Sequence, residues 1–319
     1  MFIIATFYHF FDFPDFAEKR ATLLAELRRL DIKGSLLIAS EGINGTLAGS
    51  REAIDSYLDY LKEHIVKNPF EHKESRCDRQ PFGRSKVRIK KEIISLGEAT
   101  PSLALALSSP LPLAGGARAC PREGGEGGNL SAGSECVDGF PHPASPVNGG
   151  GEGRVGRYVE PKDWNALIAD PDTLVIDARN AYEVHLGTFE RAIDPNTRNF
   201  KQLPAFVRQT LDPAQHKKIA TFCTGGIRCE KFSSWLLDQG FAEVYQLKGG
   251  ILKYLEEMPA AASRWQGECY VFDERIAVGH GLAPSQTASM CPACGHPLKE
   301  EERIKDQVPC PYCPPAFQT

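Results

Sequence analysis

The sequence lacks any long run of apolar residues. Its longest uncharged segment, residues 101–117, is interrupted by proline and glycine, so we expect no membrane-spanning helix. The apolar N-terminus has neither a basic region nor a small-residue cleavage site, and we expect a first β-strand there instead of a signal peptide. A strong charge of either sign is also missing. With a net charge of −4 over 319 residues, the chain has no overall attraction to nucleic acid, so any surface that binds it has to be local.

The sequence also lacks the fingerprints of the common redox cofactors. We find no flavin or nicotinamide motif, no iron-binding facial triad and no haem motif, so no cofactor is evident for catalysis. Ten cysteines would permit disulfides, but two C-x-x-C pairs and one cysteine in a reactive setting are more typical of a reducing compartment. We therefore expect a cytoplasmic protein. No obligate protein partner is evident, and 42% hydrophobic and 24% charged residues are typical of a globular chain with two or three domains.

Residues 1–98 alternate strand-like and helix-like patterns in the order βαββαβ. Two helices on one face of a four-stranded antiparallel sheet form the ferredoxin-like, or acylphosphatase-like, α+β arrangement. The turn-rich residues 40–44 are either a plain hairpin or a loop that touches substrate, and both readings stay open. The expected strands are residues 2–10, 35–39 and 45–48, the expected helices are 15–30 and 51–66, and residues 70–96 supply a final extended region.

A run of cations closes this domain. If residues 84–91 form a strand, alternate side chains share a face, which places Val87 and Ile89 toward the core and four cations on the other side. A charged run is usually just a solvated surface. Four cations in register, however, make a stripe that can follow the phosphates of a nucleic acid. The candidate RNA-binding residues are Arg84, Lys86, Arg88, Lys90 and Lys91.

The composition changes sharply at residues 99–156. This segment is rich in Gly, Pro, Ser and Ala and has no periodicity, so we expect a disordered linker or insertion. From 157 to 268, strands alternate with helices, which predicts an α/β domain with a parallel sheet. Ligands of such sheets bind at the carboxyl ends of the strands, and one strand there ends in Asp177, followed closely by Arg179.

Residues 219–236 contain the candidate catalytic site. A short β-branched and aromatic strand ends at Cys223, a glycine-containing turn follows, and an amphipathic helix begins near Ile227. Amide groups and the positive end of the helix dipole favour the thiolate of such a cysteine, so its pKa should be lowered. A buried, inert cysteine is the alternative, which the two glycines and the arginine make the less favoured one. The candidate catalytic residues are Cys223, Thr224, Gly225, Gly226, Ile227 and Arg228.

The length of this loop separates two chemistries. Four residues lie between Cys223 and Arg228, whereas protein phosphatases that use a cysteine and an arginine need five to encircle a phosphate. The tighter ring suits a single sulfur atom carried on Cys223, a persulfide, better than a tetrahedral oxyanion. Cys229 begins the helix and either resolves an oxidised or persulfide Cys223 as a disulfide or simply packs in the core.

The C-terminal segment, residues 269–319, contains two C-x-x-C pairs. Fifteen residues separate the pairs, which falls in the range of a tetrahedral four-cysteine zinc site. Two unrelated surface pairs are the alternative. Four thiolates would close the site, so the expected role of the metal is to fold the tail and not to catalyse. The candidate ligands are Cys291, Cys294, Cys310 and Cys313.

These motifs together resemble a known family. Residues 177–179, 187–193, 223–228 and 247–251 resemble a rhodanese domain. More narrowly, SEGINGTLAGS, KVRIKKEI, YVEPKDWNALI, CTGGIRCEK, LKGGILKYLEE and ECYVFDERIAV are similar to the rhodanese-containing tRNA uridine hydroxylase family. The resemblance covers nearly the whole chain outside residues 101–154, where the family has a much shorter link.

The resemblance implies an oxygen-dependent hydroxylation of the wobble uridine, position 34, of certain tRNAs at its C5 atom. Molecular oxygen would be the co-substrate, the reductant is not identified, and the tRNA anticodon loop would be the partner. Cys223 would be the catalytic cysteine, written in the family as a persulfide intermediate, with Asp177 and Arg179 in support. A sulfurtransferase or persulfide carrier is the alternative, since the loop alone would serve one. The basic strand of the first domain argues against it, because a carrier for small acceptors does not need that strand.

Overall fold

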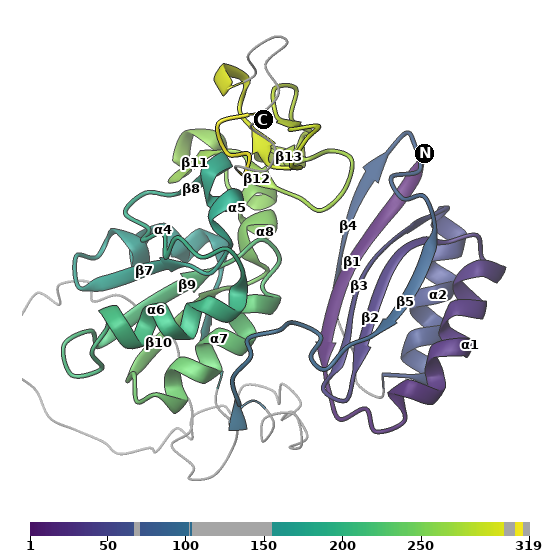
Figure 1. Cartoon of the computed structure of the whole chain (residues 1–319), viewed down its shortest axis with the longest axis horizontal. Helices are drawn as coiled ribbons and strands as arrows, with labels where there is room; N and C mark the ends of the chain where they lie inside the picture. Colours follow the sequence, from purple (N-terminus) through teal and green to yellow (C-terminus); the bar gives the residue numbers. More distant parts are fainter. Residues whose placement is uncertain (67–70, 102, 104–154, 303–309, 315–319) are drawn as a thin grey trace, which may run out of the picture.

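The computed structural model describes residues 1–66, 71–101, 103, 155–302 and 310–314. In these ranges the chain forms two domains, each built on a sheet, and a small C-terminal segment that lies against the second domain (Figure 1). Most of the expected insertion at residues 99–156 falls outside the described residues. No helix in the described ranges is long and apolar enough to cross a membrane.

The N-terminal domain packs two helices on one face of a sheet. The strand order is β4-β1-β3-β2-β5, in which β2 and β5 run parallel and the other neighbours run antiparallel. The expected α+β fold class is confirmed, with one correction, because the sheet has five strands instead of four. The elements are β1 (Phe2–Phe10), α1 (Phe16–Arg29), β2 (Lys33–Ala39), β3 (Gly42–Gly49), α2 (Arg51–His64), β4 (His72–Cys77) and β5 (Ser85–Ile89).

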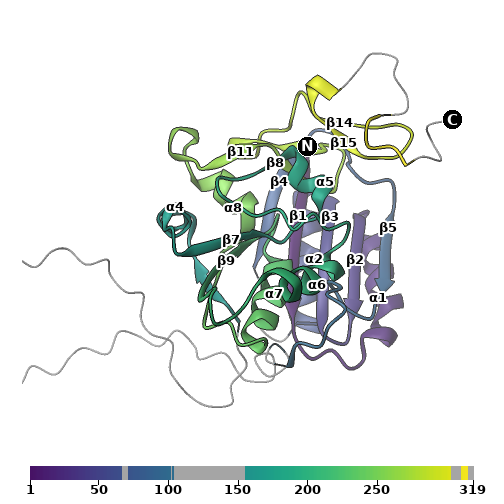
Figure 2. The same ribbon diagram turned by 60° about the vertical axis from the view of Figure 1, so that its left-hand side comes forward.

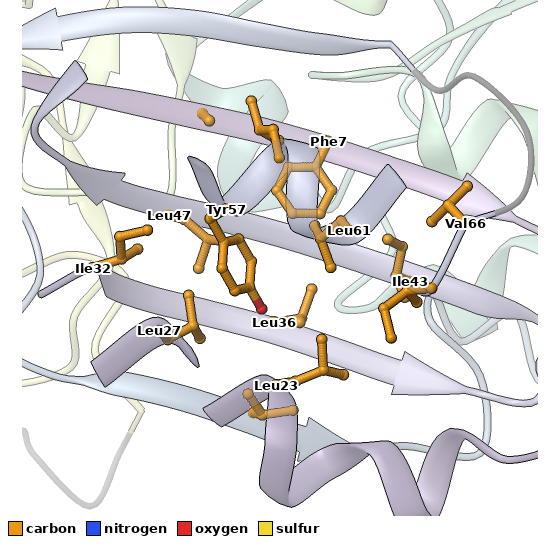
Figure 3. Packing of buried hydrophobic residues seen from close by; sticks show 14 of the residues in the cluster. Phe7, Leu23, Leu27, Ile32, Leu36, Ile43, Leu47, Tyr57, Leu61 and Val66 are labelled. Carbon is orange, nitrogen blue, oxygen red and sulfur yellow. The ribbon is translucent and has the colours of Figure 1, made fainter. Parts of the chain in front are cut away.

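The core of this domain lies between the sheet and its helices. Leu27 of α1 and Tyr57 of α2 are fully buried and pack toward Phe7 and Leu36 of the sheet (Figure 3). Buried helical residues recur three or four positions apart and buried strand residues two apart, which is the pattern that predicted both element types. In the described residues, the opposite face of the sheet carries no helix of this domain.

Two local predictions in this domain were wrong. Ile89 is 46% exposed instead of facing the core, because β5 is an edge strand whose pairing with β2 ends there. The turn expected at residues 40–44 is shorter, because β3 already begins at Gly42 and Asn44 pairs with Leu37 and Tyr8. Only Ser40 and Glu41 remain outside the strands.

The central domain has a parallel sheet in the order β6-β10-β9-β7, which confirms the expected α/β class. Phe232 and Trp235 of α7 are buried on one face, and Trp164 of α4 and Tyr254 of α8 on the other. The elements are β6 (Arg157–Val159), α4 (Pro161–Ala169), β7 (Thr173–Asp177), α5 (Ala181–Leu186), β8 (Gly187–Phe189), η1 (Phe200–Gln202), α6 (Leu203–Thr210), β9 (Lys218–Phe222), α7 (Ile227–Asp238), β10 (Glu243–Leu247), α8 (Gly250–Glu257), η2 (Ala260–Ala262) and β11 (Trp265–Gly267).

The C-terminal segment consists of short hairpins and turns beside α5 (Figures 1 and 2). It contains β12 (Cys269–Tyr270), β13 (Ala277–Val278), η3 (His280–Leu282), β14 (Ser289–Met290), β15 (Pro297–Leu298) and η4 (Glu300–Glu302).

A buried ion cluster joins the two domains. The helix-free face of the N-terminal sheet turns toward the central domain (Figure 1). Lys231 of α7 is only 2% exposed, and its ammonium lies 2.8 Å from Glu41 and 2.6 Å from Glu92. It also donates to the Ile94 carbonyl at 3.2 Å. Because a buried lysine has to be paired, this cluster fixes how the domains meet, and Glu41 of the 40–44 segment serves that contact.

Candidate active site

Cys223 lies at the carboxyl end of β9, in the loop that leads into α7. The start of α8 meets the same loop, since the amides of Ile251 and Leu252 donate to the carbonyls of Cys223 and Thr224 at 3.0 and 3.1 Å. Gly250 has a φ of 67°, and a Cβ on it would lie 2.5 Å from the Cys223 carbonyl oxygen. The close approach therefore requires glycine at this position. Two helix starts hold the loop in place.

The Cys223 sulfur accepts a hydrogen bond from the Gly226 amide at 3.1 Å and has no exposed surface. Burial alone would raise the pKa of Cys223. A hydrogen bond from Cys229, the charge of Arg228 and the Gly226 amide oppose burial and lower this pKa to about 5. The thiolate is therefore the form present at neutral pH. The sulfur is enclosed, so a substrate reaches it only if neighbouring groups move.

Cys229 is fully buried one turn into α7 and lies beside Cys223. Burial and the neighbouring Cys223 thiolate raise the pKa of Cys229 well above its ordinary value, so it stays a thiol and can donate to Cys223. Its sulfur lies 3.7 Å from the Thr221 hydroxyl oxygen. Neither cysteine forms a disulfide. This placement suits a resolving role and a packing role equally.

Arg228 is bound to a carboxylate that comes from α5. Its guanidinium makes two hydrogen bonds to Glu183, at 2.6 and 2.7 Å, and a longer one of 3.4 Å to the Thr224 hydroxyl. Glu183 is fully buried, and although burial opposes ionisation, the Arg228 charge brings the pKa of Glu183 below its ordinary value. The charge of Arg228 is thus compensated within the protein.

Asp177 and Arg179 form a second buried ion pair, at 2.9 and 2.7 Å, and neither side chain has exposed surface. Arg179 also donates to the main-chain carbonyls of Glu183 and Gly187, at 3.3 and 2.6 Å. These bonds hold the main chain of Glu183 and the residue that follows α5. Asp177 and Arg179 therefore act on the loop through α5 and do not line it.

Side chains of the N-terminal domain reach the loop from the opposite side. Lys73 of β4 donates a hydrogen bond to the Gly225 carbonyl at 3.1 Å. The hydroxyl of Tyr8 in β1 lies so near Gly226 that a Cβ there would be 3.0 Å from it. Glu230 of α7 accepts from the hydroxyls of Tyr158 and Tyr8, and burial raises the pKa of Glu230 to about 7. The loop thus lies between two domains.

Sequence reasoning did not identify Glu183, Lys73, Tyr8 or Glu230. Glu183 had a local signal, because Asn180 and Glu183 form a capping box at the start of α5, but that signal predicts a helix end and not a partner for Arg228. The other three had none: Lys73 and Tyr8 meet the loop from a distant part of the chain, and the carboxylate of Glu230 binds the distant Tyr8 and Tyr158.

The basic stripe lies at the far edge of the N-terminal sheet. It comprises the candidate RNA-binding residues Arg84, Lys86, Arg88, Lys90 and Lys91. Val87 is buried under the helices, so Lys86 and Arg88 lie on the opposite face, the one that turns toward the central domain. β5 is four strands away from β4, roughly 19 Å at the usual strand spacing. The stripe and Cys223 are therefore not brought into contact. A cavity of about 340 Å³ beside the stripe is lined by Gly34, Ser35, Phe82, Gly83, Arg84 and Lys86.

The four tail cysteines come together. Their sulfur atoms all lie within 4.8 Å of one another, and three pairs are separated by 3.6–3.7 Å. A tetrahedral zinc with Zn–S bonds of about 2.3 Å places its ligand sulfurs about 3.8 Å apart. The residues thus fit a four-cysteine zinc site. The group comprises Cys291, Cys294, Cys310 and Cys313.

Two family descriptions match the chain. Residues 2–93 match the UPF0176 acylphosphatase like domain, and residues 160–257 match the rhodanese-like domain. Among curated proteins, the tRNA uridine(34) hydroxylase of Picosynechococcus sp. is 42% identical over 316 residues, which cover 98% of this chain and 90% of that protein.

Two solved structures illustrate the similarity of single domains. An acylphosphatase from Coxiella burnetii is 14% identical over 27% of this chain and 90% of its own, with a TM-score of 0.22. A rhodanese-related protein from Thermoplasma volcanium is 23% identical over 32% of this chain and 92% of its own, with a TM-score of 0.26.

Proposed function

This chain belongs to the tRNA uridine(34) hydroxylase family, and we propose that it uses Cys223 and molecular oxygen to hydroxylate the wobble uridine of tRNA at C5. The observation that carries the proposal is the set of contacts around Cys223, which lower its pKa and hold it between two helix starts, in a chain that shares nearly its full length with a named hydroxylase.

The chemistry follows from what a thiolate does to uracil. Addition of the Cys223 sulfur to C6 breaks the 5,6 double bond and places the electron pair on C5 and the O4 enolate. C5 then attacks oxygen. One oxygen atom stays on C5 as a hydroxyl, and the other leaves as water after the O–O bond is cleaved with two electrons from a reductant and with protons from solvent. Loss of the C5 proton and expulsion of the thiolate from C6 restore the double bond. The reaction is thus of the monooxygenase type.

The residues of the chain prepare the thiolate for this addition. The Gly226 amide and the Cys229 thiol donate to the sulfur, and the Glu183–Arg228 pair holds the loop that presents it. Because the sulfur has no exposed surface, the uracil ring enters by displacing groups that cover the loop, among which Tyr8 and Lys73 come from the N-terminal domain. If Cys223 carries a persulfide, the reactive atom is the outer sulfur, which is bonded to the Cys223 sulfur.

The partner is the anticodon loop of tRNA. It would lie between the basic stripe and the Cys223 loop, on the helix-free side of the N-terminal sheet, where the cations of the stripe follow the phosphates. A cytoplasmic location fits such a substrate, and it fits the eight described cysteines, none of which forms a disulfide.

The tail cysteines would bind one structural zinc ion. The metal would replace packing that the short hairpins of the tail cannot supply, and its four thiolate ligands would leave no open position for a substrate.

Nucleoside mass spectrometry tests the main proposal. In a strain that lacks the gene, we expect 5-hydroxyuridine-derived nucleosides to return with the wild-type protein and not with Cys223→Ala. Equal restoration by the variant would remove Cys223 from the reaction. A sulfurtransferase is favoured by one observation, the rhodanese-like match at residues 160–257. Transfer of sulfur from thiosulfate to cyanide without any change in tRNA nucleosides would select that second function.

A further inference from the structure

Lys73 belongs to the N-terminal domain but contacts the catalytic loop of the central domain. It lies on β4, an edge strand that pairs only with β1 in the described part of the chain. Its ammonium donates to the Gly225 carbonyl, two residues beyond Cys223, at 3.1 Å. The contact joins positions 152 residues apart. It therefore exists only when the two domains are docked.

The charges around Lys73 differ from those around the other cations of the interface. Arg228 is paired with Glu183, and Lys231 with Glu41 and Glu92. Within residues 1–66, 71–101, 155–302 and 310–314, no carboxylate oxygen lies within 4.0 Å of the Lys73 ammonium. Because no carboxylate there neutralises it, the positive charge of Lys73 acts on the Cys223 loop.

The titratable groups that act on Lys73 come from several elements. Burial, with a smaller effect of Lys253, lowers the pKa of Lys73, while Cys223, Cys269 and Glu256 oppose the shift, and the net pKa is about 8. Cys269 is not a competing anion, because burial raises its pKa to about 12. Glu256 is exposed at the end of α8. Of the anions that act on Lys73, the Cys223 thiolate is therefore the buried one.

We propose that Lys73 is a positioning residue of the catalytic centre, which stabilises the Cys223 thiolate by its charge and fixes the Gly225 carbonyl by its hydrogen bond. The active site is then shared between two domains, and the N-terminal domain does more than bind RNA. This inference rests on the proposed use of the Cys223 thiolate. It adds that docking of the domains sets how much thiolate is present.

The test is the pH profile of Cys223 alkylation in the full-length protein. Iodoacetamide labelling is followed by fragment-ion mass spectrometry, which separates Cys223 from Cys229. The midpoint of the profile reports the pKa of the Cys223 thiol. The absolute rate does not, because limited access to the sulfur reduces the alkylation rate by the same factor at every pH. We expect Lys73→Met to raise the midpoint by about one pH unit, a tenfold loss of thiolate below it. Lys73→Arg, which keeps the charge, should stay close to the wild type.

Two further variants separate charge from structure. Lys73→Gln keeps a hydrogen-bond donor for Gly225 and loses the charge, so its midpoint should follow that of Lys73→Met. Lys62→Met removes an exposed lysine of α2 and should leave the midpoint unchanged. Thermal melts show whether Lys73→Gln and Lys73→Met are folded. If both are unfolded, the alkylation midpoint of Lys73→Arg is compared with that of the wild type, and the two must match.

Wild-type midpoints in folded Lys73→Gln or Lys73→Met would overturn the proposal, and so would a midpoint of Lys73→Arg raised as far as theirs. The alkylation uses neither tRNA nor oxygen. A shifted midpoint therefore supports the role of Lys73 even if no hydroxylated nucleoside is found, and an unchanged midpoint rejects it even if the hydroxylase activity is present.

Discussion

Glu183 and Arg228 form a buried two-point ion pair, 45 residues apart in the chain, with N–O distances of 2.6 and 2.7 Å. The pair connects α5 to the Cys223 loop and compensates the charge of Arg228 within the protein. Arg228 still lowers the pKa of Cys223, but its guanidinium donates to Glu183 and Thr224 in the described structure. The main consequence of the Glu183–Arg228 pair is that it holds the Cys223 loop rigid.

Removal of the Glu183 charge should destabilise the fold strongly. Glu183→Gln leaves Arg228 buried without a counter-charge, and breaking a buried pair on one side costs about 3–5 kcal/mol in the free energy of unfolding. Urea denaturation followed by circular dichroism measures this loss. The matched control is Glu190→Gln, which breaks the exposed pair with Arg264 and should cost about 0–1 kcal/mol. Similar losses in both variants would contradict the prediction.

Glu230 should make stability fall as pH rises through the acidic range. Burial raises the pKa of Glu230 from 4.5 to about 7, so between these values the folded state holds a proton that the unfolded state has released. The free energy of unfolding therefore decreases from pH 4.5 to pH 7, by ~3 kcal/mol, and the loss stays constant above that.

The matched variant is Glu230→Gln, which keeps an acceptor for Tyr158 and removes the titration. Its melting temperature should equal the wild-type value near pH 4.5 and exceed it by a growing margin up to pH 7. A margin that does not vary with pH would show that Glu230 is ionised throughout in the folded protein.

Local patterns predicted the elements, and they could not predict the contacts between them. The apolar spacing in residues 51–66 and the strand-turn-helix pattern at Cys223 correspond to α2 and to the β9–α7 loop. The edge position of β5 was not predicted. The alternation of side chains places Val87 toward the core, but it does not show whether a strand lies at the edge of the sheet. That is why Ile89 was assigned to the core.

The contacts that shape the site lie beyond any local pattern. The bond from Lys73 to Gly225 spans 152 residues, and the contact between Lys231 and Glu41 spans 190. Such pairs depend on how the two folded domains pack against each other. This packing produces no periodic pattern in the sequence of either domain. The cysteine spacing of the tail was more informative, because C-x-x-C pairs limit by themselves the geometry of a shared metal.

Loss of zinc from the tail should loosen α5. His185 of α5 lies 2.8 Å from Glu302 and contacts the Tyr312 ring, which sits between two of the cysteines. We expect about one zinc per chain by elemental mass spectrometry. Its removal by a chelator should speed hydrogen exchange at residues 181–186. Cys294→Ser should do the same, whereas Cys77→Ser, which lies outside the cluster, should not. A metal-free protein with slow exchange in this helix would rule out the site.

Charge reversal on the basic stripe should weaken tRNA binding in a salt-dependent manner. Lys86 and Arg88 lie on the sheet face that turns toward the central domain, where an anticodon loop approaching Cys223 would pass. Each phosphate contact that is lost should reduce the slope of log K against log salt by about one. Filter binding at several salt concentrations measures both the affinity and the slope.

The control places the same charge change elsewhere. Lys62→Glu lies on α2, on the helix-covered side of the sheet, and alters the net charge of the protein as much as Lys86→Glu does. If the stripe binds RNA, Lys86→Glu and Arg88→Glu lower the affinity and the slope while Lys62→Glu leaves both near the wild type. If all three variants act alike, the protein responds to its net charge alone, and the path of the anticodon loop has to be sought on another face.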